Sequence, residues 1–120
     1  MRWSVEFSDE VRLWYLSLSP GGKATTDRIL ERLASHGHML RMPHSRSLDG
    51  GLFELRFTCE NVNRRIPYVF DPHRKAVTLT TFRKQRQNER AEVLRARRAQ
   101  AAHEEARRAD GTNHEKGVTR

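Results

Sequence analysis

The chain has 120 residues, which is enough for one domain and excludes a second folded domain of ordinary size. Its 36% hydrophobic and 32% charged residues predict a small core in only part of the chain. The net charge of +8 favours nucleic acid or an acidic protein as partner and argues against a carrier of free acidic ligands. Cys59 is the only cysteine, which excludes an intrachain disulfide and favours a reducing, cytoplasmic location. No run approaches the roughly 20 apolar residues of a membrane span, so we expect no membrane protein. The N-terminal MRWSVEFSDE carries acids where a signal peptide needs an apolar run, so we expect no exported protein either.

The first forty residues predict one strand followed by two helices. Apolar residues alternate over residues 2–7, as in a half-buried strand. Ser8 is a plausible N-cap for a short helix, whose apolar stripe is Val11, Trp14, Tyr15 and Leu18. We expect Ser19-Pro20-Gly21-Gly22 to end this helix as a turn. A second helix is predicted over residues 24–35, ending before Gly37.

The rest of the chain predicts three strands and a long helix. Alternating patterns indicate strands over about residues 52–57, 65–70 and 76–82, joined as a meander. Pro67 donates no hydrogen bond, so we expect a free edge or a bulge beside it. Strong helix formers predict a helix over about residues 86–109, followed by a disordered polar tail at 110–120.

These elements predict an α+β fold of order β-α-α-β-β-β-α. A small, twisted antiparallel sheet would pack on the two N-terminal helices, and the long C-terminal helix would follow. We cannot derive from the sequence whether that last helix docks on the sheet or projects to hold a partner.

The positive charge is concentrated in the middle of the chain. Residues 41–90 carry eleven basic and five acidic side chains, interleaved with apolar ones, which predicts a folded basic face. Arg56 lies in mid-strand, on the face opposite Phe53, Leu55 and Phe57, and shares that face with Glu54. It either pairs with an acid for structural reasons or binds phosphate, and the strand pattern leaves both open. Other basic residues lie at strand ends or in loops, where they converge on Arg56 or are solvated: Arg46, Arg65, Arg74, Arg83 and Lys84.

Other kinds of site have weaker support. The six histidines show no spacing with acids or thiols that suits zinc, so we expect no metal site. Cys59 lacks a flanking pattern of reactive cysteines and is interpreted as structural. The pairs Gly21-Gly22 and Gly50-Gly51 do not stand in a phosphate-loop spacing, and we interpret them as turns.

Two segments of the sequence resemble a known family: MPHSRSLDGGLFELRF, and RRIPYVFDPHRKAVTLTTFRKQRQNERAEVLRAR. They resemble the RelE/ParE toxin superfamily, most closely its HigB-like, phage-derived branch, over about residues 2–100. The matching positions are Leu40, Pro43, Arg46, Leu48, Gly51 to Arg56, Arg65 to Tyr68, and Phe82 to Lys84.

The resemblance implies a single toxin domain over residues 1–109 and the toxin of a type II toxin–antitoxin system. Such a toxin is a ribosome-dependent endoribonuclease that cuts mRNA through attack of the ribose 2′-OH, with neither metal ion nor cofactor. A small helix-turn-helix antitoxin would neutralise it, and the ribosome and mRNA would be its other partners. Carried onto this chain, the catalytic residues are Arg56, Lys84 and Arg83, and the RNA- or phosphate-binding residues are Arg46, Arg65 and Arg74.

The chain departs from the family pattern after Phe82–Lys84, where Gln85-Arg86-Gln87-Asn88 follows. No His or Tyr is present there, so the general acid is unassigned. Two alternatives keep the fold without the RNA cleavage: a ParE-type inhibitor of DNA gyrase, and a non-catalytic, phage-derived nucleic-acid-binding protein. A small helix-turn-helix gene beside this one would favour a toxin.

Overall fold

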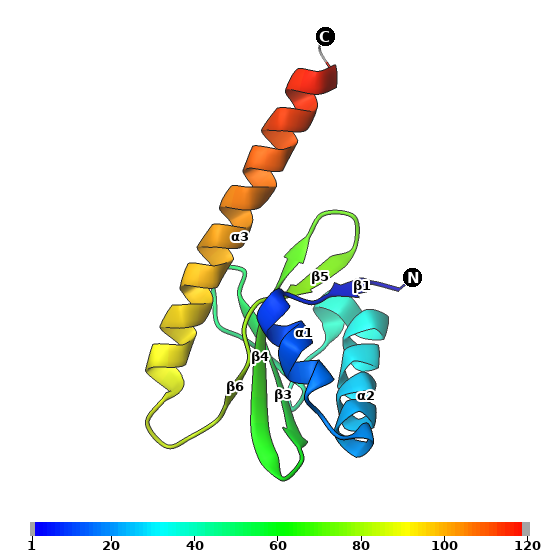
Figure 1. Ribbon diagram of the computed structural model, residues 1–120, viewed down its shortest axis with the longest axis vertical. Coiled ribbons are helices and arrows are strands. Elements are labelled where there is room, and N and C mark those ends of the chain that lie inside the picture. The colour runs from blue at the N-terminus through cyan, green and yellow to red at the C-terminus, as the bar shows by residue number, and fades with distance from the viewer. Residues whose placement is uncertain (1, 119–120) are drawn as a thin grey trace.

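The computed structural model describes the backbone of residues 2–118 and the side chains of residues 2–110 (Figure 1). Within residues 2–118, six strands and three helices, with one turn of 3₁₀ helix at Gly37–Met39, confirm the α+β fold class. The strands are β1 (Ser4–Glu6), β2 (Ser45–Ser47), β3 (Phe53–Cys59), β4 (Val62–Asp71), β5 (Lys75–Thr78) and β6 (Phe82–Arg83). The helices are α1 (Asp9–Leu16), α2 (Pro20–His36) and α3 (Glu89–Val118).

The sheet is mixed, with strand order β1-β5-β4-β3-β2 and with β6 beside β4. The meander of β3, β4 and β5 is antiparallel, as expected. Strand β2 was not predicted, and the expected strand over residues 76–82 is divided into β5 and β6. However, β1 runs parallel to β5, with Val5 opposite Ala76, so the sheet is not antiparallel throughout. This pairing joins segments some seventy residues apart, and the alternation of apolar residues carries no information about strand direction.

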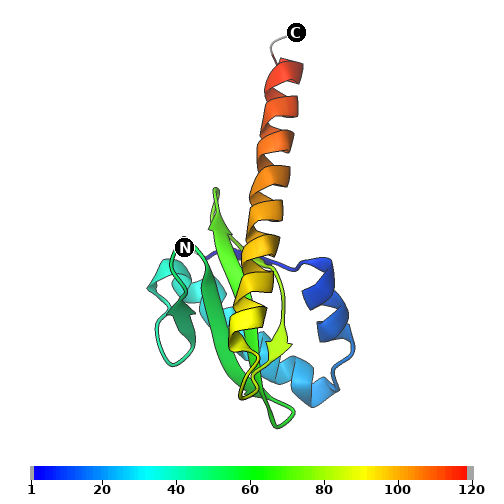
Figure 2. The ribbon, with the colours of Figure 1, turned by 90° about the vertical axis from the view of Figure 1, so that its left-hand side faces the viewer.

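Helices cover both faces of the sheet (Figures 1 and 2). On one face, α1 and α2 enclose the main core, whose centre includes Leu33, Leu55, Ile66 and Tyr68. On the other face, the first half of α3 places the fully buried Ala96 against a smaller apolar cluster of Leu52, Val69, Val77 and Leu79. The C-terminal part of α3 continues past the body of the domain, so this helix both docks and projects (Figure 1).

Helix α2 begins earlier than the predicted residue 24. Ser19 caps it by accepting a hydrogen bond from the Gly22 N–H, and Pro20 occupies the first helical position. Proline is favoured there because its missing N–H would have no partner in the helix and its φ is already helical. The Pro-Gly-Gly segment therefore starts a helix, and the prediction of a turn at Gly21-Gly22 was wrong. Gly50-Gly51 is a turn, with positive φ at both residues.

Helix α3 differs from its predicted limits at both ends. It begins at Glu89 because the Asn88 side chain holds the preceding turn, accepting from the Gln85 N–H and donating to the Arg83 carbonyl. It ends at Val118, where we expected disorder from residue 110; once nucleated, a helix extends at small cost per residue. Residues 119 and 120 of the expected tail lie outside the described residues. Within residues 2–118, no helix is long and apolar enough to cross a membrane.

Pro67 lies inside the buried strand β4, where the partner strand is interrupted. On that side of β4, β5 pairs with residues from Tyr68 onward and β6 pairs with Arg64 and Arg65. The Pro67 carbonyl accepts from the Leu79 N–H in the gap between these two pairings. The proline therefore stands where the ladder needs no donor from it, which fits the predicted irregularity.

Candidate functional site

Three arginines from neighbouring strands surround one carboxylate on the face of the sheet that α3 partly covers. Arg46 of β2 is opposite Glu54 of β3, and Arg56 of β3 is opposite Arg65 of β4. Residues opposite each other share a face, as do residues two apart on one strand, so all four side chains project to the same side. Glu54 Oε1 lies 3.7 Å from Arg46 Nη2, 3.9 Å from Arg56 Nε and 3.8 Å from Arg65 Nε. We call Arg46, Arg56 and Arg65 the arginine cluster.

The side chains of the cluster and of Glu54 differ in how deeply they are buried. The side chain of Glu54 is fully buried, that of Arg65 is 10% exposed, and those of Arg56 and Arg46 are 24% and 41% exposed. Burial, and after it the charge of Arg56, lowers the pKa of Arg65. Arg56 and Arg46 therefore present positive charge to solvent, while Arg65 supports them from beneath.

Glu54 has an unusual environment for a carboxylate. Neither of its oxygens accepts a hydrogen bond within the described residues, although three guanidinium groups lie within 4 Å. Burial raises the pKa of Glu54 above the ordinary carboxyl range, and the positive charges of Arg46, Arg65 and Arg56 oppose this rise. The sequence pattern allowed Arg56 to pair with Glu54, and the structure contains this ion pair.

A second carboxylate links the cluster to a lysine. Glu89, in the first turn of α3, accepts from Arg46 Nη2 at 2.9 Å and from Lys84 Nζ at 3.2 Å. The hydrogen bond from Lys84 is the main cause that lowers the pKa of Glu89. Lys84 is thereby held beside the cluster at the start of α3.

Two of the predicted site residues lie elsewhere. Arg83 pairs in register with Arg64, on the opposite side of the sheet from Phe82 and Arg65. Arg74 lies in the turn before β5, where its guanidinium carbon is 5.8 Å from the Trp3 ring centroid. The structure thus brings Arg46, Arg56, Arg65 and Lys84 together and leaves Arg83 and Arg74 apart, while the functional roles of all six stay predictions.

Glu89 belongs to the candidate site but was not predicted from the sequence. Its two partners are 43 and 5 residues away, and only the docking of α3 brings the three side chains together. The only local signal is an acid in the first turn of a predicted helix, which the helix dipole alone explains.

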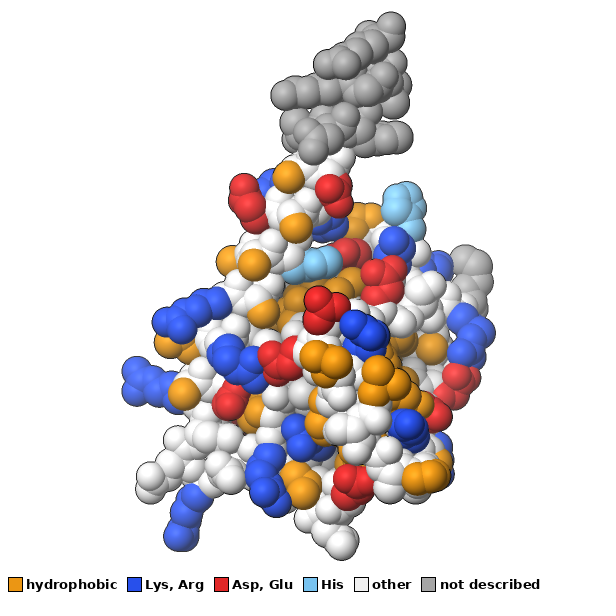
Figure 3. All heavy atoms as spheres, in the orientation of Figure 1, with side chains coloured by type: hydrophobic (Ala, Val, Ile, Leu, Met, Phe, Trp, Pro, Cys, Tyr) orange, Lys and Arg blue, Asp and Glu red, His pale blue; other side chains and the backbone are white. Residues whose placement is uncertain are grey.

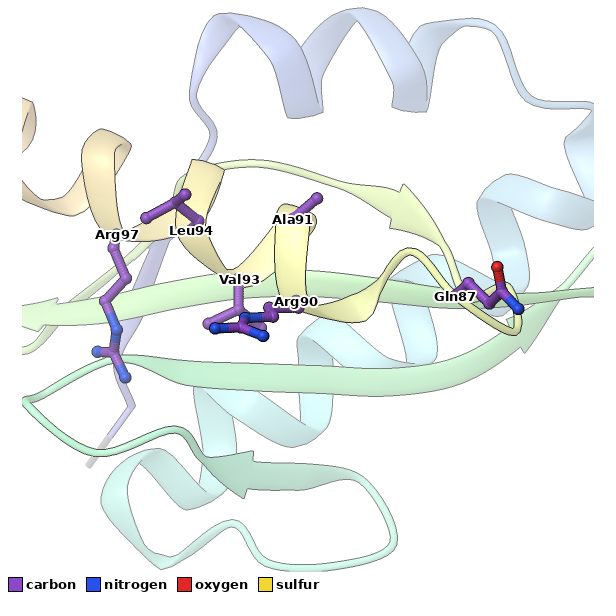
Figure 4. Close-up of a pocket in the computed structure, with 6 residues that line it drawn as sticks. All are labelled: Gln87, Arg90, Ala91, Val93, Leu94 and Arg97. Carbon is purple, nitrogen blue, oxygen red and sulfur yellow. The ribbon is translucent and has the colours of Figure 1, made fainter.

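The cysteine, the histidines and the surface pocket offer no comparable set of reactive groups among the described residues. Cys59 is buried, with its Sγ 3.7 Å from Thr26 Oγ1, as a structural cysteine should be. Among the described residues, no three potential metal-ligating side chains of His, Cys, Asp or Glu come together. A surface pocket lies along the first turns of α3 (Figure 4), lined by Gln87, Arg90, Ala91, Val93, Leu94 and Arg97. Its only ionisable groups are arginines, and one of them, Arg97, donates to the Asp49 carbonyl.

Residues 14–104 match the family described as "Phage derived protein Gp49-like (DUF891)", which is more than half of the chain. The chain belongs to this Gp49-like family. No curated protein matches the sequence.

Two solved structures share the fold of this Gp49-like protein. The toxin–antitoxin complex RelBE2 from Mycobacterium tuberculosis matches with a TM-score of 0.53 and 19% identity, over 70% of this chain and 100% of the matched chain. A mutant of the E. coli toxin RelE in the free state matches with a TM-score of 0.56 and 9% identity, over 80% of this chain and 94% of the other. At these identities the matches show the fold alone, and they confirm the resemblance to RelE at that level.

Proposed function

We propose that this Gp49-like protein is the toxin of a type II toxin–antitoxin system and a ribosome-dependent endoribonuclease acting on mRNA. The observation that carries the proposal is the arginine cluster, with Lys84 beside it, on a face that is open to solvent at Arg46 and Arg56. Guanidinium groups bind phosphate through forked hydrogen bonds and retain their charge at any physiological pH. A convergent set of them suits an RNA backbone better than it suits a neutral or cationic ligand.

In the proposed reaction, the 2′-OH of a ribose attacks the adjacent phosphorus. The bond from phosphorus to the 5′ oxygen of the next nucleotide breaks, leaving a 2′,3′-cyclic phosphate and a free 5′-OH. Arg56, supported by Arg65, would stabilise the negative charge that develops on the phosphate oxygens. Lys84 would act as phosphate clamp or proton-transfer group, since Glu89 holds its Nζ beside the cluster.

The proposed partners follow from the same function. The matched Mycobacterium tuberculosis structure is a toxin–antitoxin complex, which supports an antitoxin for this chain as well. We propose a small helix-turn-helix antitoxin encoded by a neighbouring gene, with the ribosome and mRNA as the targets in the cytoplasm.

Substitution of Arg56 tests the proposal. Wild-type protein should arrest growth on induction and fragment translated mRNA, whereas Arg56→Ala should lose about 100-fold or more in cleavage rate, as when one transition-state donor is removed. Primer extension on a reporter mRNA, with purified protein and programmed ribosomes, measures that rate. Arg28→Ala is a matched control because it removes one arginine from the exposed face of α2, outside the cluster.

Two outcomes would contradict the ribonuclease. Growth arrest with intact mRNA would favour the gyrase inhibitor, which a supercoiling assay can detect. Equal cleavage by wild type and Arg56→Ala would remove Arg56 from the catalytic role.

A further inference from the structure

RNA binding by itself does not explain why Glu54 lies at the centre of the candidate site. Its side chain is fully buried, so it cannot contact a substrate. A negative charge beneath a phosphate-binding surface also weakens the attraction for phosphate. Its presence at the centre of three arginines therefore calls for a role exerted through those arginines.

The charged groups around Glu54 come from every element packed against it. Arg46, Arg56 and Arg65 reach it from β2, β3 and β4, while Glu89 from α3 adds a second negative charge on the side of Arg46. Lys84 forms an ion pair with Glu89, with its Nζ 3.2 Å from Glu89 Oε2. Three guanidinium groups this close repel one another, and an arginine side chain has several rotatable bonds through which it can move out to solvent.

We propose that Glu54 is a positioning residue, whose buried carboxylate holds the guanidinium groups of Arg46, Arg56 and Arg65 in one convergent set facing the RNA phosphate. The substrate named here rests on the function proposed above. The ordering of the arginines by Glu54 does not rest on it.

The ionised form of Glu54 is the one that attracts the arginines. Burial raises the pKa of this carboxyl, so protonation begins at a higher pH than for an exposed glutamate. As the pH falls through that raised pKa, the central negative charge is lost and the arginine cluster loosens. Positioning by charge thus predicts a pH dependence that a side chain filling space would not produce.

Glu54→Gln is the sharpest substitution, since it keeps the size of the side chain and removes its charge. In primer extension with programmed ribosomes, kcat should fall about 10- to 100-fold through misplacement of the reacting groups. The wild-type rate should decline on the acidic side, and this acidic limb should be absent in Glu54→Gln. Glu60→Gln is the matched control: it also removes one carboxylate, on the turn after β3, where Glu60 accepts from Ser19.

A second measurement needs no RNA. In the NMR spectrum of the wild-type protein, the Nε–Hε signals of the three arginines should shift together as the Glu54 carboxyl carbon titrates. In Glu54→Gln the same signals should broaden or move to the position of exposed arginines, while the thermal melt reports whether the variant folds.

The two measurements separate this proposal from the function. If wild type cleaves no mRNA, the proposed function fails, and the NMR titration still decides the role of Glu54. Arginine signals that ignore the Glu54 titration would overturn the proposal, as would a folded Glu54→Gln variant with wild-type cleavage and an unchanged pH profile.

Discussion

At the scale of single residues, Glu10 shows how an ion pair attaches α3 to the rest of the domain. Its Oε2 accepts from Arg95 Nη2 at 2.9 Å and from the Thr81 N–H at 2.9 Å. Partial burial alone would raise the pKa of Glu10, but these hydrogen bonds outweigh it, and the net direction is downward. The same contact raises the pKa of Arg95, which stays charged throughout.

This lowered pKa predicts a pH-dependent contribution to stability. The ion pair should stabilise the fold fully above the ordinary pKa of glutamate, and the stabilisation should disappear as the pH falls through the lower pKa of the folded state. Glu10→Gln should therefore reduce the free energy of unfolding at pH 7 by about 1 kcal/mol or less, since both side chains are partly exposed. Urea unfolding at pH 7 and at pH 3 measures the difference, which should be smaller at the lower pH. A difference that persists undiminished at pH 3 would contradict it.

At the scale of elements, the docking of α3 decides the shape of the site. The helix buries Ala96 against the sheet, and further along it Gln100 donates to the Gly50 carbonyl and His103 contacts Asp71. This attachment places Glu89, at the start of the helix, beside Arg46 and Lys84. The position of Glu89 therefore depends on packing several turns away.

Ala96→Leu tests that attachment. The position has no exposed surface, so the larger side chain should overpack the interface and reduce the free energy of unfolding by about 1–3 kcal/mol. Ala101→Leu makes the same change at an exposed position of the same helix and should be close to neutral. Urea denaturation of the two variants gives the comparison. Equal stability of Ala96→Leu and Ala101→Leu would show that the docking of α3 on the sheet does not depend on the packing of Ala96.

At the scale of the whole molecule, the candidate site takes up a small part of the positive charge. In the view of Figure 3, Lys and Arg side chains project from the first half of α3 and from several parts of the body, with Asp and Glu side chains among them, and the net charge is +8. Only four of the cations form the candidate site: Arg46, Arg56, Arg65 and Lys84.

A set of this size predicts how RNA binding responds to salt. With three or four phosphates contacted, log K for a single-stranded oligoribonucleotide should fall against log salt with a slope of about −2 to −3. Lys84→Ala should reduce the magnitude of this slope by about 0.7. Fluorescence anisotropy at KCl concentrations from about 50 to about 300 mM measures the slope for the wild type and for Lys84→Ala. Binding that ignores salt would argue against a phosphate-binding face.

The sequence by itself determined most of the local elements, though not all of their ends, and which residues of a strand share a face. Alternation in β3 put Arg56 and Glu54 together on the face opposite Phe53 and Leu55, because side chains in a strand alternate between the two faces. The motifs around these residues also carried the resemblance to RelE, whose fold the chain shares. Such features depend on neighbours a few positions apart, and the chain order contains them.

The tertiary structure alone decided which distant residues meet. The parallel pairing of β1 with β5, the contact of Glu89 with Arg46, and the separation of Arg74 from the cluster arise from strand order and helix docking. Arg83 pairs with Arg64 and Phe82 pairs with Arg65, so Arg83 lies on the other side of the sheet from Arg65, although the two arginines carry the same charge. The sequence predicts a basic site, whereas the residues that form this site are decided by contacts that exist only in the folded chain.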